Sequence, residues 1–201
     1  MVSEESTTST ESEISVLERL YLQNTREILL TIICIAFGIS FFLGLSIIEM
    51  PHIMISFFAL GLAPAYAIIA VSGAIRGPLV GFLVGFLGKL CTDLFLYSVI
   101  PIMGLPALAY GVLGLIVGLS TYNIENGRSL AKMAILSIIG LVFTLMFVVV
   151  IGLLIGDVAI LVLIGFQLLP ELTLGLPSVF LLTPIFARIW YILKEIIPLP
   201  F

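Results

Sequence analysis

Long stretches without charge alternate with short polar turns along most of this chain of 201 residues. Residues 28–48 carry no charged side chain, and a helix of that length crosses a hydrocarbon core of about 30 Å. Comparable apolar stretches follow, separated by turns that hold proline, glycine or charged residues. The pattern predicts an all-α integral membrane protein with a six-transmembrane-helix bundle over residues 28–195. The expected spans are approximately residues 28–48, 62–75, 78–97, 105–121, 130–155 and 171–191.

The connection between the first two expected spans is apolar but broken. Residues 49–52 (EMPH) end the first span, and Gly61 and Pro64 interrupt the apolar segment that follows. We therefore expect residues 53–61 to form a membrane-level loop or re-entrant turn on the outer side. Non-helical backbone is tolerated at that depth only where protein buries it or where it lines a cavity. Residues 156–170 are also apolar, and we expect them to be irregular.

The basic residues predict an orientation. Seven of the eight lie in four places that alternate between the spans. Cytoplasmic loops retain Lys and Arg, so a six-span chain with both termini cytoplasmic explains all four places. The chain is 61% hydrophobic and 10% charged. A soluble domain of this size cannot bury that much apolar surface, so we expect a multi-pass protein of the cell (plasma) membrane. The seven residues are Arg19, Arg26, Arg76, Arg128, Lys132, Arg188 and Lys194.

The two ends of the chain differ from the spans. Residues 1–13 are rich in Ser, Thr and Glu and lack the basic start of a signal peptide, so we expect a disordered acidic tail in the cytoplasm. Residues 14–27 have apolar side chains near one helical face, which fits either a short interfacial helix or an extension of the first span. Residues 196–201 are expected to be a C-terminal tail.

Several function classes have little support in the sequence. Eight basic residues spread over separate places form no patch for nucleic acid. We find no zinc spacing, phosphate-binding loop, nucleophile elbow or dinucleotide fingerprint, so we expect no enzyme, cofactor or metal site. Cys34 and Cys91 lie within apolar segments and are expected to be free thiols.

The eighth basic residue, Lys89, lies inside a span, where an ionisable group is costly and often functional. Asp93 lies four residues further on, on the same helical face. The two side chains either neutralise each other or line a wet cavity that contacts a solute, and one reading does not exclude the other. Lys89 would favour a solute with a carboxylate or phosphate. We expect outer-side segments to converge on one solute site, with Lys89, Asp93, Tyr110, Gln167 and Glu171 as its residues.

Small residues recur at helical spacing in three places. The series Gly73, Gly77, Gly81 and Gly85, and the series Gly111, Gly114 and Gly118, allow close approach of helices. We expect these two faces to pack inside the bundle, with partner binding as the alternative. On the first span, small residues predict a groove for a helix of another protein or, equally, internal packing. They are Cys34, Ala36, Gly38, Ser40 and Gly44.

The run from Gly73 to Asp93 (GAIRGPLVGFLVGFLGKLCTD) resembles the signature of S components of energy-coupling factor (ECF) transporters. In that family a short second helix ends in a Gly-Pro turn, and a glycine-rich third helix has a polar end. The outer prolines Pro101 and Pro106, the glycines of the fourth span, and the segment from Leu169-Pro170 to Arg188 are also similar. The position of Lys89 is often acidic in the family, so the resemblance does not name the solute.

The resemblance implies a substrate-binding membrane subunit of a micronutrient importer, which takes a vitamin-like solute from outside. A transmembrane T protein and two cytoplasmic ATPases would drive transport. Ala36 and Ser40 match the family's coupling face on the first helix, and residues 50–61 match the loop that covers its solute site. The alternatives are a six-span scaffold of the rod-shape and cell-wall machinery, or a small channel.

Overall fold

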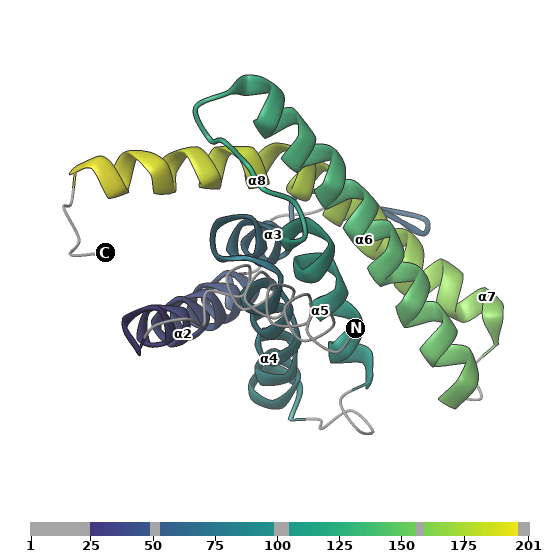
Figure 1. The fold of residues 1–201 in the computed structure, drawn as a ribbon. Coiled ribbons are helices and arrows are strands. Elements are labelled where there is room, and N and C mark those ends of the chain that lie inside the picture. The colour runs from purple at the N-terminus through teal and green to yellow at the C-terminus, as the bar shows by residue number, and fades with distance from the viewer. Residues whose placement is uncertain (1–24, 49–52, 99–104, 156–158, 197–201) are drawn as a thin grey trace, which may run out of the picture.

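The computed structural model of the protein describes residues 25–48, 53–98, 105–155 and 159–196 (Figure 1). The predicted tail 1–13, most of segment 14–27 and all but the first residue of the tail 196–201 lie outside these ranges. Residues 25–27, which are described, form the first turn of a helix. The elements are α2 (Thr25–Ile47), β1 (Ile53–Ile55), β2 (Phe58–Leu60), α3 (Pro64–Arg76), α4 (Pro78–Tyr97), α5 (Leu105–Gly118), α6 (Gly127–Ile155), α7 (Ile160–Val162), the π-helix η2 (Leu163–Leu168) and α8 (Leu169–Ile196).

The helical membrane fold agrees with the sequence prediction. Within the described ranges, four helical segments are long and apolar enough to cross a membrane, and two further apolar helices are shorter. A helix of about 13 residues spans roughly 20 Å, less than the hydrocarbon core. Six complete spans and cytoplasmic termini therefore stay predictions. The four long segments are Thr25–Ile47, Pro78–Leu96, Gly127–Leu154 and Ile160–Lys194, and the shorter ones are Pro64–Arg76 and Pro106–Gly118.

The expected loop at 53–61 is instead a small antiparallel hairpin, with Ile53 opposite Leu60 and Ile55 opposite Phe58. Ser56 has a φ of 58°, which turns the chain between the strands. Pairing the two strands satisfies backbone groups that an irregular loop would leave exposed to an apolar environment. A short apolar run has no periodicity that separates strand from loop, so the sequence did not predict this form.

Helices α4 and α5 are in backbone contact through their glycines. A Cβ atom added to Gly81 or to Gly114 would collide with the backbone of the other, and one added to Gly118 would collide with Pro78. The expectation that these glycine faces pack internally is confirmed. In the same way Gly85 lies against the backbone carbonyl of Tyr110, which fixes the height of that tyrosine relative to α4.

The described part of the segment before the last helix is more regular than expected, whereas residues 156–158 lie outside the described residues. From Ile160 onward, α7 and η2 lead directly into α8, which contains Pro177 and Pro184. Figure 1 shows α8 crossing α6 with the opposite chain direction, while α3, α4 and α5 lie together in the middle and α2 lies at their side. Among the described elements, strand β2 of the hairpin packs against helix α8.

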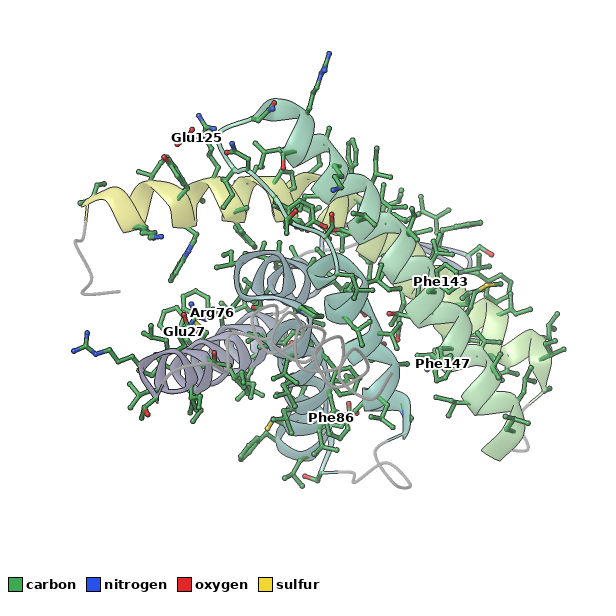
Figure 2. All side chains as sticks on the ribbon, in the orientation of Figure 1. Glu27, Arg76, Phe86, Glu125, Phe143 and Phe147 are labelled. Atoms are coloured by element: carbon green, nitrogen blue, oxygen red, sulfur yellow. The ribbon has the colours of Figure 1, made fainter. Side chains whose placement is uncertain are left out.

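The start of α2, which carries Arg26, and the end of α3, which carries Arg76, lie at one end of the bundle. The Arg76 guanidinium donates a hydrogen bond to the backbone carbonyl of Glu27 at 3.2 Å, and the two residues lie side by side in Figure 2. The end of α5 at Gly118 touches the start of α4 at Pro78. The start of α2, the α3–α4 turn and the end of α5 therefore lie together.

The last part of α8 contacts the loop between α5 and α6. Arg188 donates to the backbone carbonyl of Ile124 at 3.2 Å, and the Tyr191 hydroxyl donates to Glu125 Oε1 at 2.5 Å. We name this side of the molecule the basic end. Its described basic residues are Arg26, Arg76, Arg128, Lys132, Arg188 and Lys194.

Candidate functional site

Lys89 and Asp93 form the expected pair in the second half of α4. The Lys89 ammonium lies 2.8 Å from Asp93 Oδ1, and the side chains are 22% and 11% exposed. Their four-residue spacing places them one turn apart, so each lowers the cost of burying the other. The pairing is confirmed, and whether a solute also contacts it stays a prediction.

Tyr110 of α5 connects this pair to α8. The Lys89 ammonium lies 5.3 Å from the centre of the Tyr110 ring, within the range of a cation–π interaction. The Tyr110 hydroxyl donates a hydrogen bond to Glu171 Oε2 at 2.5 Å, and Tyr110 itself is 2% exposed. Four of the five predicted site residues thus meet between α4, α5 and α8.

Tyr66 of α3 belongs to the same group; the sequence left open whether it is an interfacial residue or part of a cavity wall. Its ring is parallel to that of Tyr110, with centroids 5.8 Å apart and planes 7° apart, and its side chain lies near Glu171. The signal in the sequence was the position of Tyr66 in an otherwise apolar segment, residues 64–71. A tyrosine on such a helix needs a polar partner inside the protein. We name Lys89, Asp93, Tyr110, Glu171 and Tyr66 the polar cluster.

Gln167 is half-buried in the π-helix η2. Within the described part of the chain, no hydrogen bond joins it to the polar cluster, so its place in the site stays a prediction. Segments of π-helix occur often at functional sites, because one residue per turn is displaced from the regular register. We keep Gln167 as a predicted residue of the solute site because it lies four residues before Glu171.

Thr144 of α6 is a further candidate that the sequence did not suggest. It is fully buried, and its hydroxyl has no hydrogen-bond partner among the described residues. One turn away, Leu141 lies against Gly175 of α8. Because α6 and α8 run in opposite directions, Thr144, one turn after Leu141, and Glu171, one turn before Gly175, are displaced from this contact in the same direction along the bundle. The hydroxyl is therefore at the level of the polar cluster, where buried polar groups normally have partners.

The hairpin is attached to α8 next to the cluster. The backbone amide of Ala59 donates to Thr173 Oγ1 at 3.1 Å, and Thr173 follows Glu171 by two residues. Phe57 packs edge-on against Phe166 of η2, with ring centroids 5.4 Å apart. The segment expected to cover the site is thus fixed to the helix that supplies Glu171.

The small-residue face of α2 divides into two. Gly38 is buried, and a Cβ atom there would collide with Val84 of α4. Ala36 and Ser40 are exposed, and the Ser40 hydroxyl donates to the carbonyl of Ala36 at 2.8 Å, which removes its polarity from the surface. Gly44 continues this face with open space around it. Internal packing therefore explains Gly38 alone, and the expected coupling residues face outward.

Comparison with known proteins identifies the family. The family model described as "ECF-type riboflavin transporter, S component" matches residues 23–185. Similar curated relatives are UPF0397 proteins. One from Aliivibrio fischeri is 36% identical over 97 residues, 48% of this chain and 50% of the relative. One from Aliivibrio salmonicida is 38% identical over 90 residues, 44% and 46% of the two chains.

The chain spans about half the length of these curated relatives. No solved structure matches it. The family model covers most of the chain, including all five residues of the polar cluster and the exposed face of α2. The chain therefore belongs to the S-component family of ECF-type transporters, and it is a multi-pass membrane protein.

Proposed function

We propose that this chain is the solute-binding subunit of an ECF-type micronutrient importer, and that the polar cluster binds the solute from outside the cell. The observation that carries the proposal is the Tyr110–Glu171 hydrogen bond beside the Lys89–Asp93 pair. Three ionisable groups in one half of a membrane bundle are costly to bury and are found where a solute or an ion is handled. Transporters place such groups among apolar walls near the solute.

The charges of the cluster favour a neutral solute rich in hydroxyl groups. Lys89 already has a carboxylate 2.8 Å away, and Glu171 adds a second acidic group. A free carboxylate or phosphate on the solute would meet more acid than base, which argues against the solute type that Lys89 alone suggested. Hydroxyl groups donate to carboxylate oxygens, and phenol and ammonium groups donate to carbonyls.

Riboflavin is the solute to test first. The matched family description names it, and its planar ring, carbonyls and hydroxylated side chain suit the groups of the cluster. The parallel rings of Tyr66 and Tyr110 offer a flat aromatic surface, on which a planar ring can stack with an offset. The carboxylates of Asp93 and Glu171 would accept from the hydroxylated chain.

Transport would need partners, because the sequence contains no ATP-binding motif. We propose that a transmembrane T protein docks a helix on Ala36, Ser40 and Gly44, and that two cytoplasmic ATPases act through it. Small residues let two helix backbones approach closely in lipid, where dispersion replaces the hydrophobic effect. The scaffold and channel alternatives have no comparable support, since the matched family is one of transporter subunits.

The binding test uses the fluorescence of riboflavin, which we expect to be quenched when the purified chain is added. Glu171→Gln keeps the size of the side chain but removes the charge that accepts hydrogen bonds. We expect its affinity to fall by about 1.5–3 kcal/mol, or roughly 10- to 150-fold. Glu125→Gln is the matched control, because Glu125 also accepts from a tyrosine at 2.5 Å but lies at the basic end.

Riboflavin affinity that is equal in Glu171→Gln and Glu125→Gln would exclude the polar cluster as its site. No quenching with the unchanged chain would exclude riboflavin and leave other neutral, hydroxylated vitamins to be tested in the same pair of variants.

The coupling test is separate. Ala36→Trp and Ser40→Trp should abolish co-purification with the T protein while solute binding survives, because a bulky side chain separates the backbones. Ile139→Trp, on an exposed position of α6, controls for a bulky residue on the lipid-facing surface. Undiminished complex formation in both α2 variants would rule this face out.

A further inference from the structure

A shallow hollow lies at the basic end and shares no residue with the polar cluster. Its volume is about 520 Å³. It is formed where the loop after α5 meets the first two turns of α6. It is lined by Thr121, Tyr122, Asn123, Arg128, Ser129 and Lys132. The proposed transport mechanism assigns no role to these residues.

The hollow has a positive charge that the described residues do not neutralise. Arg128 and Lys132 are four residues apart, so they lie on one face of α6, and neither forms an ion pair with any residue in the described ranges. The nearest acid along the chain, Glu125, accepts the Tyr191 hydroxyl at 2.5 Å and is directed toward α8. Both cations are at the start of a helix, whose backbone amides add partial positive charge.

The walls of the hollow supply a rigid surface and a hydroxyl donor. The Tyr122 hydroxyl donates to the carbonyl of Val117 at 2.8 Å, and the Lys132 ammonium lies 5.7 Å from the centre of the Tyr122 ring. Ser129 Oγ accepts the backbone amide of Asn123 at 2.8 Å, so the proton of Ser129 can be donated into the hollow. Two cations and a hydroxyl are the donors that a phosphate group requires.

An apolar stripe continues from the hollow along α6. At spacings of three and four residues after Lys132, exposed large apolar side chains follow on the same face. Figure 2 labels Phe143 among them. A free phosphate has no apolar part that could contact this stripe, whereas a phospholipid has both a charged headgroup and long apolar chains. The stripe consists of Ile135, Ile139, Phe143 and Met146.

We propose that the hollow binds the headgroup of an anionic phospholipid, with Arg128 and Lys132 at its phosphate and an acyl chain along the stripe of α6. Basic residues next to a transmembrane helix are attracted to anionic lipid. The lipid would hold the α5–α6 loop at the membrane surface. That loop is also bonded to the end of α8 through Ile124 and Glu125.

The test is a native mass spectrometry titration of the purified full chain with three probes. These are a short-chain phosphatidylglycerol, a phosphatidylcholine of the same chain length, and glycerol 3-phosphate. We expect the phosphatidylglycerol to bind more tightly than the other two. Each cation near the membrane surface contributes about 1 kcal/mol, so the double variant Arg128→Gln/Lys132→Gln should bind it roughly thirtyfold more weakly.

Two control variants separate the hollow from general charge. Lys194→Gln removes an exposed cation near the end of α8 and should leave the affinity unchanged. Arg128→Lys combined with Lys132→Arg keeps both charges and should retain binding, which also shows that changes at these positions leave the chain folded.

Three results would overturn the proposal. One is an unchanged affinity for phosphatidylglycerol in the double glutamine variant. This result counts against the proposal even if the same variant loses binding to a protein partner in a separate experiment. Another is an equal loss in Lys194→Gln, which would mean attraction to overall charge. The third is glycerol 3-phosphate that binds as tightly as the lipid, which would make the hollow a site for free phosphate.

Discussion

Two tyrosine–glutamate hydrogen bonds of equal length connect α8 to other parts of the molecule, one at each end. Tyr110 donates to Glu171 at 2.5 Å, and Tyr191 donates to Glu125 at 2.5 Å. The donor of the first bond, Tyr110, is buried, and the buried Asp93 lies nearby. The second lies at the exposed end of the chain's most polar loop. The chemistry is the same, and only the surroundings differ.

The difference in surroundings changes what each bond means. At the exposed end, water can replace the tyrosine, so the bond contributes little and its glutamate needs no further explanation. In the polar cluster, Tyr110 and Asp93 are buried, and a carboxylate there costs free energy unless its bonds are complete. Ionisable groups with that cost occur in membrane proteins mainly where they bind a solute or an ion. For this reason we assign the solute site to this end of the molecule.

The largest expected difference between the two ends concerns glycine. Gly85 touches the backbone carbonyl of Tyr110, whereas Gly127 has open space around it. Gly85→Ala should force α4 and α5 apart and destabilise the protein by about 1–3 kcal/mol or prevent folding. Gly127→Ala should change the unfolding free energy by less than about 0.5 kcal/mol. Unfolding in mixed micelles measures both, and equal stabilities would contradict the close contact at Tyr110.

The next difference concerns the two tyrosines themselves. Tyr110→Phe leaves the half-buried Glu171 without one donor and should lower the unfolding free energy by about 1.5 kcal/mol. Tyr191→Phe makes the same chemical change at an exposed site and should cost less than about 0.5 kcal/mol. The measurement is again unfolding in mixed micelles. If the two variants lose equal stability, burial does not distinguish the two bonds.

The smallest effect is expected at high pH. Partial burial of its ring raises the pKa of Tyr122 from 10.0 to about 12. Between these values the unfolded chain has lost the proton and the folded chain still holds it. The stabilising contribution of Tyr122 is therefore complete below pH 10 and is lost as the pH rises toward 12. Absorbance of tyrosinate should show a tyrosine that titrates near pH 12 in the unchanged chain and is missing in Tyr122→Phe. A curve of unchanged shape would contradict the burial.

The parts of the fold that the sequence predicted are those set by local rules. Hydrocarbon thickness sets the length of a span, so residues 28–48 predicted α2 closely. The Lys89–Asp93 pair was predicted because residues four apart on a helix are neighbours. The hairpin was not predicted, since a short apolar run is compatible with strand, loop or helix.

Long-range features were harder to predict. Tyr110 and Glu171 are 61 residues apart in the chain, and only the expected convergence of outer segments placed them together. Tyr66 could not be assigned to the site from the sequence, because the rotation of α3 decides whether its ring faces lipid or protein, and periodicity does not fix that rotation in a helix that is apolar all round. Rotation of α2 likewise separates the buried Gly38 from the exposed Ala36.

The most direct test of the solute site removes the ion pair as a unit. Replacing a buried pair by apolar residues leaves no unpaired charge, so Lys89→Met combined with Asp93→Leu should keep the chain folded. If these side chains contact the solute, calorimetry should show that the double variant binds it more weakly by about 1.5–3 kcal/mol. An unchanged dissociation constant would contradict this account and leave Lys89 and Asp93 with a structural role alone.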